Sequence, residues 1–202
     1  MSRSAIFKKI EAATHALKTK AAMPDYDVAI TESAPKLQGA NRVEMFSNNL
    51  KAVNGKTMTS VAELAEFLTS TNQRHGYCDP ALYDQIGAPL AAAGLTVTTT
   101  YDRNRYDDYQ FGITRATGGI AESGTLILDD HNTSHRLAAL SPWVHVAVLE
   151  RVTIHLTIAD ALAALGASPN IIWATGPSKT ADVEGILIEG VHGPGEQIAL
   201  IL

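Results

Sequence analysis

The pattern that most constrains this 202-residue chain is an alternation of apolar, strand-like runs with helix-like segments from Lys56 to the C-terminus. Val144–Leu149 is an almost continuous apolar run, 170–174 is a second, and 95–100 is rich in β-branched residues. A strand that is apolar at nearly every position is expected when both faces of a sheet are covered. The sequence therefore predicts βαβ units, and with them an α/β fold whose mainly parallel sheet is flanked by helices.

Helix starts are marked by capping boxes, in which a Ser or Thr and an acidic residue three positions later cap the first turn. The chain contains two of them, Ser60-x-x-Glu63 and Thr157-x-x-Asp160. They predict a helix over 61–72 and another that ends at Gly166. The buried side of the second helix is expected to carry Ile158, Leu162 and Leu165. Further helices are expected over 80–93, with a break at 87–89, and over 134–140.

Shorter strands are expected near 76–78, 110–117 and 124–129. The last two apolar segments, 185–189 and 197–202, are predicted to pair as a hairpin across the loop 190–196. Open parallel sheets bind ligands outside the carboxyl ends of their strands. A functional site is therefore expected in the loops that leave the strands.

Charge divides the chain into two parts. Residues 1–60 carry nine Lys and Arg against five Asp and Glu, a balance of +4, whereas 61–202 carry seven against sixteen, a balance of −9. Ile6, Ile10, Ala13 and Leu17 recur at the spacing of an amphipathic helix. Residues 23–55 show no sustained period, apart from one short helical segment around 43–50. We predict a basic N-terminal helical arm with an irregular connection over 1–55, and an α/β domain over 56–202.

Composition argues against several classes of protein. The net charge of −5 is unlike that of nucleic-acid-binding proteins, which neutralise phosphates with Lys and Arg. A single cysteine, Cys78, cannot hold an iron–sulfur cluster or form an internal disulfide. No apolar run approaches the roughly 18 residues of a membrane-spanning helix, so no membrane span is predicted. The N-terminus also lacks the apolar stretch of a signal peptide, and a cytoplasmic protein is expected.

The first candidate segment runs from Gly112 to Thr125 and places four glycines around Arg115 and Glu122. Glycine lets the backbone approach a ligand closely, so Gly124 and Thr125 are predicted to contact one. If water is removed from around Glu122, its carboxylate suits a general base or a nucleophile, and Arg115 suits an anion. The structural alternative is that Glu122 pairs with Arg115 and caps nearby backbone amides.

The second candidate segment, 175–184, follows the apolar run 170–174. Gly176 turns the chain, and Ser178 is expected to cap a short helix whose free amides favour an anion. Lys179 adds a positive charge, and Thr180 and Asp182 complete the predicted ligand-binding set. The alternative is an ordinary helix cap beside a solvated lysine. The chain has neither the G-x-x-x-x-G-K-[ST] phosphate loop nor the G-x-G-x-x-G dinucleotide motif.

The third candidate segment, 190–195, places His192 between glycines, where an imidazole can act as an acid or a base near neutral pH. The alternative is a hairpin loop with an exposed histidine. His131 and His135 are four residues apart, and His145 lies in an apolar run. Because no carboxylate-rich ligand set accompanies these histidines, no metal site is predicted.

Four segments, in this order and spacing, resemble the LUD domain of the lactate-utilisation protein C family: GIAESGT at 119–125, SPWVHVAV at 141–148, TGPSKTAD at 175–182 and GVHGP at 190–194. The resemblance runs from about Lys56 to the C-terminus. It implies a fold similar to the superfamily of ribose-5-phosphate isomerase, glucosamine-6-phosphate deaminase and coenzyme A transferases. The turn at Glu122 is also similar to the Ser-Glu-Asn-Gly turn of some coenzyme A transferases, whose glutamate is the nucleophile, although Ala121 and Ser123 replace two of its positions.

The resemblance further implies a role beside two partner proteins, at least one of them with iron–sulfur clusters, that together oxidise L-lactate to pyruvate. The chain itself would hold no cofactor. The residues themselves lead to a further expectation: the chain binds a small carboxylate or phosphate in one cleft formed by Arg115, Glu122, Ser178, Lys179 and His192, because all five lie on glycine-rich loops predicted at strand ends. Glu122 or His192 would take a proton. Two other functions stay open. One is an assembly or regulatory module whose basic arm docks on an acidic partner, and the other is a free-standing isomerase or acyl-transferring enzyme that uses Glu122.

Overall fold

The computed structural model describes residues 2–15, 37, 39, 41–130, 132–133, 135–166, 170–182 and 184–202. The chain divides into two compact units, Met1–Glu32 and Ser33–Leu202. The first contains helix α1 (Arg3–His15), which confirms the predicted N-terminal helix. No residue of α1 is buried, and its apolar side chains Ile6, Phe7 and Ile10 are about half exposed. Leu17, the last position of the predicted stripe, lies outside the described residues.

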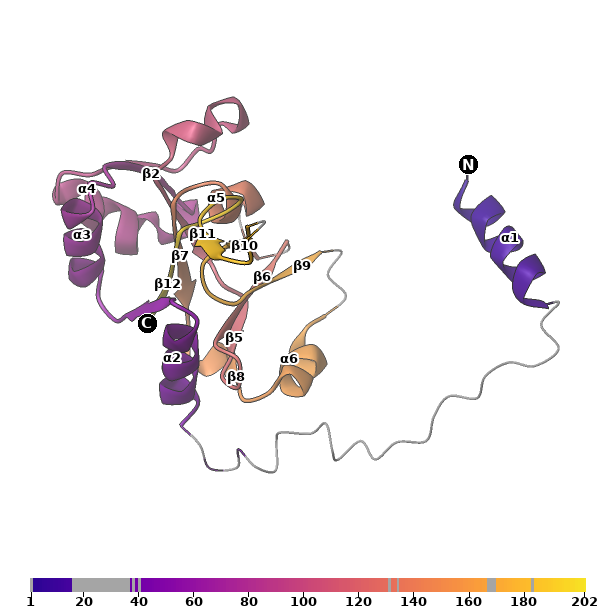
Figure 1. The fold of residues 1–202 in the computed structure, drawn as a ribbon. Coiled ribbons are helices and arrows are strands. Elements are labelled where there is room, and N and C mark those ends of the chain that lie inside the picture. The colour runs from indigo at the N-terminus through magenta and orange to yellow at the C-terminus, as the bar shows by residue number, and fades with distance from the viewer. Residues whose placement is uncertain are drawn as a thin grey trace. The chain divides into compact units, whose positions relative to one another are not determined.

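Six strands form the main sheet of the second unit (Figure 1). In spatial order they are β1 (Lys56–Met58), β12 (Glu196–Ile201), β7 (Val144–Leu149), β4 (Phe111–Arg115), β2 (His75–Cys78) and β3 (Thr96–Thr98). Every neighbouring pair is parallel, which confirms an α/β fold with a parallel sheet. All six residues of β7 are buried, as its apolar sequence predicts for a strand covered on both faces.

One face of the main sheet is covered by helical segments. These are α3 (Val61–Ser70), the 3₁₀ turn η3 (Pro80–Leu82), the π-helical turn η4 (Tyr83–Gly87) and α4 (Ala88–Ala92). Leu64, Leu68 and Leu90 from these segments pack against Phe111 and Ile113 of β4. The hydroxyl of Ser60 accepts a hydrogen bond from the backbone of Glu63, so the predicted cap begins α3.

The other face is covered by a second sheet and two helices, and a third helix packs on the second sheet. The second sheet has the order β8 (Ile154–His155), β5 (Gly118–Ile120), β6 (Thr125–Asp129), β9 (Ile171–Ala174). The helices are α2 (Arg42–Ala52), α5 (Arg136–Leu140) and α6 (Ile158–Ala164). Phe46 and Leu50 of α2 are fully buried against Ala147, Leu149 and Ile201 of the main sheet. The second unit also contains two short 3₁₀ segments, η5 (Arg103–Asp108) and η6 (Arg151–Thr153).

Helix α2 bears on the predicted organisation of the chain. The sequence places it inside the arm 1–55, and its contacts place it in the core of the unit Ser33–Leu202. The predicted boundary between an arm over 1–55 and a domain over 56–202 therefore remains a prediction. None of the helices in the described part of the chain has the length and apolarity needed to span a membrane.

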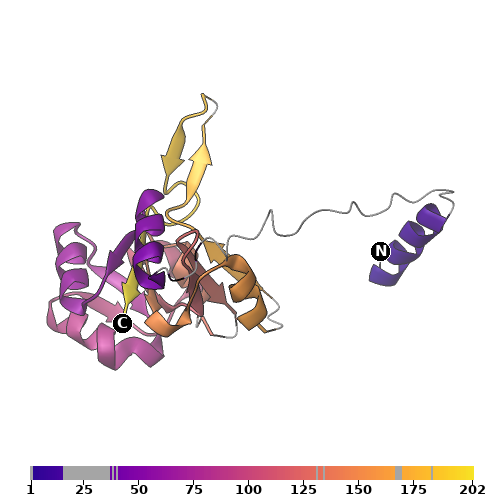
Figure 2. The same cartoon turned by 90° about the horizontal axis from the view of Figure 1, so that it is seen from below.

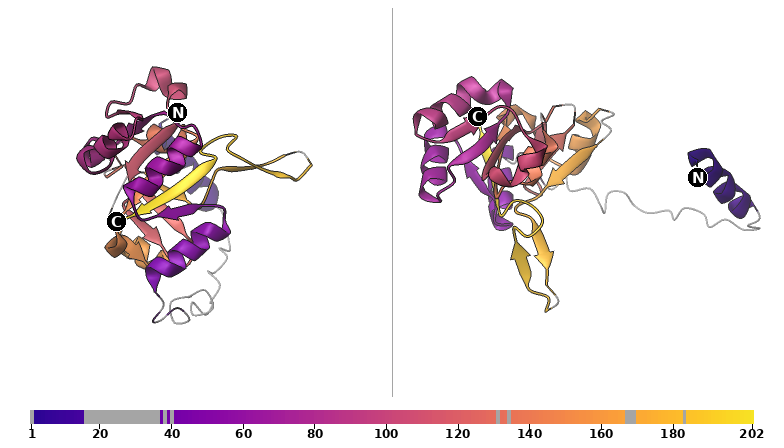
Figure 3. Two further views of the ribbon diagram at one scale, coloured as in Figure 1. Left: turned by 90° about the vertical axis from the view of Figure 1, so that its left-hand side faces the viewer. Right: turned by 90° about the horizontal axis from the view of Figure 1, so that it is seen from above.

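The predicted C-terminal hairpin is wrong. Segment 185–189 contains β11 (Leu187–Glu189), which pairs with β10 (Lys179–Ala181) in an antiparallel ribbon. This ribbon extends away from both sheets (Figures 2 and 3). The other predicted arm is β12, which lies between β1 and β7 in the main sheet. Its Ile198–Ile201 residues are buried on both faces, and a two-stranded ribbon cannot bury such a run.

Two predicted burial patterns are also wrong. Strand β9 is an edge strand rather than a buried one, and Trp173 is 36% exposed. Helix α6 has the predicted capping box, but its Ile158 and Leu162 are exposed and Ala161 is buried instead. The third predicted residue, Leu165, is partly buried against the same cluster as Ala161, as expected. A helix of seven residues buries little more than one position, and here the small Ala161 packs against Ile120 of the second sheet.

Candidate functional site

Three of the predicted site residues, Gly176, Ser178 and His192, line one cavity of about 280 Å³. His145 and Gln197, the second residues of β7 and β12, line it as well. Since the strands are parallel, these positions lie at the amino ends of the main sheet. We call this cavity the amino-edge cavity. The expectation of a site at the carboxyl ends of the main sheet is wrong for His192, because its loop 190–195 runs from β11 into the amino end of β12. Gly176 and Ser178 do follow a strand, but that strand is β9 of the second sheet.

Backbone hydrogen bonds join the two loops of the amino-edge cavity. The amide of Ser178 donates to the carbonyl of Pro194 at 2.9 Å, and the amide of Gly190 donates to the carbonyl of Ser178 at 2.9 Å. Gly176 has a φ of +79°, and a Cβ there would lie 2.6 Å from the carbonyl oxygen of Val53. A larger residue at 176 would therefore be strained and would also collide with the backbone.

His145 and Gln197 contribute buried polar side chains to the wall of this cavity, and Thr114 hydrogen-bonds to His145 outside the lining. Nδ1 of His145 lies 3.0 Å from Oε1 of Gln197, and Nε2 lies 2.9 Å from Oγ1 of Thr114. Since Oε1 only accepts, Nδ1 donates to it and Nε2 accepts from the Thr114 hydroxyl. Burial lowers the pKa of His145 to about 4, so the imidazole is neutral near pH 7. Because His145 lies in an apolar run, the sequence does not indicate that it lines a cavity. No local pattern marks Gln197 as a cavity residue either.

A second cavity of about 640 Å³, the outer cavity, lies on the other side of the His192 loop. Its lining shares His192, Gly193 and Leu140 with the amino-edge cavity and adds Arg103 and Tyr106 from η5. His192 therefore contacts two adjoining spaces, one of them small and one large enough for a drug-sized ligand. The sequence gives no signal for Arg103 and Tyr106 as site residues, since η5 contains no glycine-rich pattern.

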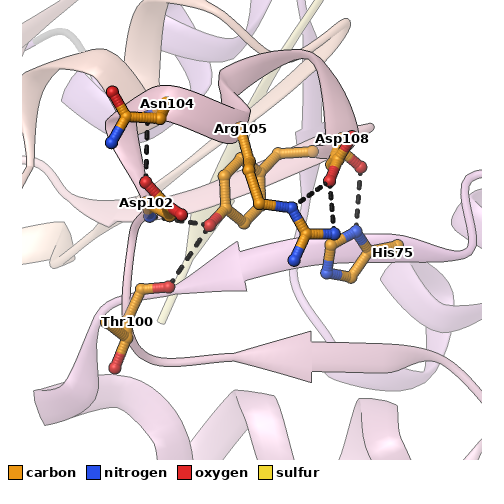
Figure 4. A network of polar contacts seen from close by, with 7 residues as sticks. His75, Thr100, Asp102, Asn104, Arg105 and Asp108 are labelled. Atoms are coloured by element: carbon orange, nitrogen blue, oxygen red, sulfur yellow. Dashed lines mark hydrogen bonds and ion pairs between the residues drawn. The ribbon is translucent and has the colours of Figure 1, made fainter.

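Polar contacts hold η5 in place beside the outer cavity (Figure 4). The carboxylate of Asp102 accepts from the amide of Asn104 at 2.9 Å, and Arg105 donates to Asp108 at 2.7 Å. The Tyr109 hydroxyl accepts from the amide of Asp102 at 2.8 Å and so ties the start of the segment to its end. Nδ1 of His75, in β2, lies 2.8 Å from the carbonyl oxygen of Asp108. These contacts fix the backbone that carries Arg103.

Arg115 and Glu122 lie outside the amino-edge cavity. Nε of Arg115 donates to Asp79 at 2.9 Å at the carboxyl end of β4, the opposite edge of the main sheet. Oε1 of Glu122 accepts from the amide of Ile158 at 2.6 Å, in the first turn of α6. The alternative expectation that Glu122 caps backbone amides is confirmed for this amide, whereas its predicted pairing with Arg115 is wrong. The predicted single cleft of Arg115, Glu122, Ser178, Lys179 and His192 is therefore not formed.

Gly124 and Thr125 connect the Glu122 turn to neighbouring elements. Gly124 has a φ of +66°, and a Cβ there would lie 2.2 Å from the backbone nitrogen of Leu50 in α2. This close approach to a helix explains the glycine without a ligand. The hydroxyls of Thr125 and Thr175 hydrogen-bond at 2.7 Å and join β6 to the start of the segment that carries Ser178.

Lys179, Thr180 and Asp182 lie on the β10–β11 ribbon. The prediction that Ser178 caps a short helix is wrong, because the residues after Ser178 form β10. The predicted anion site at that helix N-terminus is therefore absent among the described residues. Nζ of Lys179 donates to the carbonyl of Val53 at 3.2 Å and lies 3.4 Å from a carboxylate oxygen of Glu189. Asp182 uses its backbone amide to bond Ile186 in the turn of the ribbon.

No metal centre is found among the residues that the structure describes, since no three His, Cys, Asp or Glu side chains gather in a suitable group. His131 lies outside these residues. His135 stacks on the ring of Tyr101, with 4.2 Å between centroids, and burial lowers its pKa. His145 uses both ring nitrogens in the contacts above.

Comparison with known proteins shows which family this chain resembles. The family model of the LUD domain matches residues 84–202, more than half of the chain. The chain is 34% identical over 87 residues to Lactate utilization protein C of Deinococcus radiodurans, covering 41% of each chain. It is 33% identical over 159 residues to the protein of the same name from Anoxybacillus flavithermus, covering 71% of this chain and 72% of the relative.

A solved structure shares the fold. The crystal structure of a DUF162 family protein from Deinococcus radiodurans matches with a TM-score of 0.58 and 22% identity, over 80% of this chain and 96% of that one. For several sequence relatives the match is partial: the chain spans 41% of the length of the Deinococcus protein and 38% of one from Bacillus pumilus. The family model matches more than half of the chain, and the Anoxybacillus relative is covered over more than two thirds of its length, so the family is established. The chain belongs to the LUD domain family.

Proposed function

We propose that this chain is the cluster-free subunit of a cytoplasmic system that oxidises L-lactate to pyruvate. The system would include two partner proteins, at least one of which holds the iron–sulfur clusters that carry the electrons. The observation that supports this most is the 33% identity to Lactate utilization protein C of Anoxybacillus flavithermus over about seven tenths of both chains. The amino-edge cavity, at about 280 Å³, has room for a small carboxylate or phosphate with water around it.

The state of Cys78 fits a subunit without clusters. It is the one cysteine of the sequence, and its side chain is fully buried. Burial raises the pKa of the thiol to about 12, so it stays protonated near neutral pH. Cluster ligands are thiolates, and one cluster takes several of them. Electrons from lactate would therefore pass to thiolate-held clusters on the partner proteins.

His192 is the residue of this chain best placed to move a proton. Its imidazole lines the amino-edge cavity beside Ser178 and opens on the outer cavity as well. Oxidation of lactate to pyruvate releases two electrons, which would pass to the clusters, and two protons, one from the hydroxyl group and one from the carbon that bears it. A solvent-accessible imidazole can accept these protons in turn and pass them to water. Ser178 and the backbone of the loop 190–195 would hold the carboxylate. Arg115 and Glu122 belong to other parts of the structure, so no step is assigned to them.

Reconstitution tests this proposal. The chain is produced with the proteins encoded by its neighbouring genes, and lactate-dependent dye reduction is measured with each component omitted in turn. We expect no activity without this chain and at least tenfold lower activity with His192→Gln. His155→Gln, on β8 and outside both cavities, is the matched control and should retain activity. Full lactate oxidation without this chain would refute the proposal.

A second candidate function, an assembly module, is favoured by the β10–β11 ribbon. Ile186, Leu187 and Ile188 are 59%, 64% and 45% exposed, an unusual density of bare aliphatic side chains on one short element. If the chain works only by assembly, His192→Gln supports full activity in the reconstituted system. Leu187→Ser would then abolish both activity and co-purification of a partner.

A further inference from the structure

The winding of the main sheet reverses between β2 and β4. Segments after β1 and β2 run over the face covered by α3 and α4, whereas those after β4 and β7 run over the face that packs on the second sheet. Ligands of open α/β sheets bind outside the carboxyl ends of the strands at such a reversal. Asp79 follows β2 directly and Arg115 is the last residue of β4, so this pair occupies the reversal point.

Asp79 fixes the orientation of Arg115. The carboxylate is nearly inaccessible, and its oxygens accept from the amide of Ala81 at 2.9 Å and from Nε of Arg115 at 2.9 Å. The Arg115 side chain is 44% exposed, and within the described parts of the chain its guanidinium bonds only to Asp79. The terminal nitrogens are thus held at the surface as a planar pair of donors, a geometry that suits a carboxylate or a phosphate.

These donors line a cavity of about 490 Å³, the carboxyl-edge cavity. A second cation, Arg151, follows β7 and lines it too, together with Glu150 and Gln85. The remaining walls are apolar and are formed by Leu82, Ala116, Val148, Val152 and Leu202. The volume falls in the range of small-molecule sites. The lining joins cationic donors for an acidic head group to aliphatic walls for a hydrocarbon chain.

The charges around the site disfavour a ligand with more than one negative charge. Arg115 and Arg151 contribute two positive charges, and Asp79 and Glu150 contribute two negative ones. A monocarboxylate therefore adds one uncompensated charge to the site, whereas a phosphate dianion adds two. The apolar walls favour a ligand with an aliphatic chain, because removing aliphatic surface from water stabilises the complex.

We propose that the carboxyl-edge cavity is a second ligand site, separate from the amino-edge cavity, and that it binds a monocarboxylate with a short aliphatic chain. Arg115 binds the carboxylate, Asp79 positions Arg115, and Arg151 adds a further charge. The site does not depend on the function proposed above, since it shares no residue with the amino-edge cavity.

Calorimetric titration of the full chain with hexanoate tests the site. We expect saturable binding that Arg115→Gln and Arg151→Gln each weaken about tenfold, the usual size of a lost charge-assisted hydrogen bond. Arg136→Gln is the matched control, because Arg136 also pairs with an aspartate and its side chain is 43% exposed, against 44% for Arg115. It should change the affinity less than twofold. Acetate, which has no aliphatic chain, should bind at least tenfold more weakly.

Four results would overturn the proposal: no hexanoate binding by the unmodified chain, equal affinities for the Arg115 and Arg136 variants, displacement of hexanoate by inorganic phosphate, or loss of hexanoate binding in His192→Gln. If Arg115→Gln fails to fold, the hexanoate affinity of Arg151→Gln tests the site instead. Arg151 is exposed, and its substitution leaves the ion pair between Arg115 and Asp79 intact. Loss of lactate oxidation in His192→Gln with unchanged hexanoate affinity would leave this site standing and support the function proposed above. If His192→Gln retains both lactate oxidation and hexanoate affinity, only the proposed proton-transfer role of His192 is refuted.

Discussion

Burial of His145 makes the stability of this protein depend on pH. The imidazole is neutral in the folded chain, with a pKa of about 4 against 6.5 in a solvated chain. The unfolded chain therefore binds more protons than the folded chain at any pH between these values, and the free energy of unfolding falls as the pH falls. The contribution is fully present above pH 6.5 and is lost progressively down to about pH 4.

The size of this loss follows from the two pKa values. The full difference corresponds to about 3 kcal/mol, and about 2 kcal/mol of it is lost between pH 7 and pH 5. Urea unfolding at both pH values measures the change. His145→Gln removes the titrating group and keeps a polar side chain between Thr114 and Gln197, so it should lose about 2 kcal/mol less than the unmodified chain over this interval. All other groups titrate in both proteins, so their contribution cancels in the comparison. Equal losses in the two proteins would refute the buried neutral imidazole.

Three further predictions concern packing, reactivity and the surface. Gly124→Ala should cost more than 2 kcal/mol in urea unfolding, because its Cβ meets the backbone of Leu50, whereas Gly185→Ala, with a similar φ but open space around it, should cost about 1 kcal/mol. The Cys78 thiol should react with a disulfide reagent at least about a thousandfold more slowly in the folded chain than in urea, since its pKa is raised from 9.0 to about 12; comparable rates would show that it is accessible. Leu187→Ser should change the free energy of unfolding by less than about 0.5 kcal/mol, because the side chain is 64% exposed; a large loss would mean that the ribbon is packed.

The regular elements were predictable because their signals are local. Val144–Leu149 is a strand at its predicted bounds, and the Ser60 and Thr157 caps begin helices where the sequence places them. The C-terminal hairpin was not predictable in this way. A strand signal does not say which partner a strand takes, and β12 pairs with β1 and β7, both of which lie far from it in the sequence.

The candidate site was predictable in part for the same reason. Glycine-rich loops indicate close backbone approach, and the loops of Gly176 and His192 do meet at one cavity. The side chains that complete the cavities come from strands or lie far away in the sequence. Gln197 resembles any polar residue at a strand start, and Asp79 is 36 positions from the arginine that it orients. Ser178 resembled a helix cap, but pairing of β10 with β11 determined the conformation after it.

Two consecutive residues of β4 take part in two separate polar contacts. Thr114 bonds to the buried imidazole of His145, and Arg115, the next residue, bonds to the carboxylate of Asp79. Side chains of neighbouring strand residues point to opposite faces, so a substitution at either position alters one environment only. Insertion or deletion of one residue in β4 would exchange the two faces and disrupt both contacts at once. We therefore expect natural variants of this chain to keep the length of β4 constant.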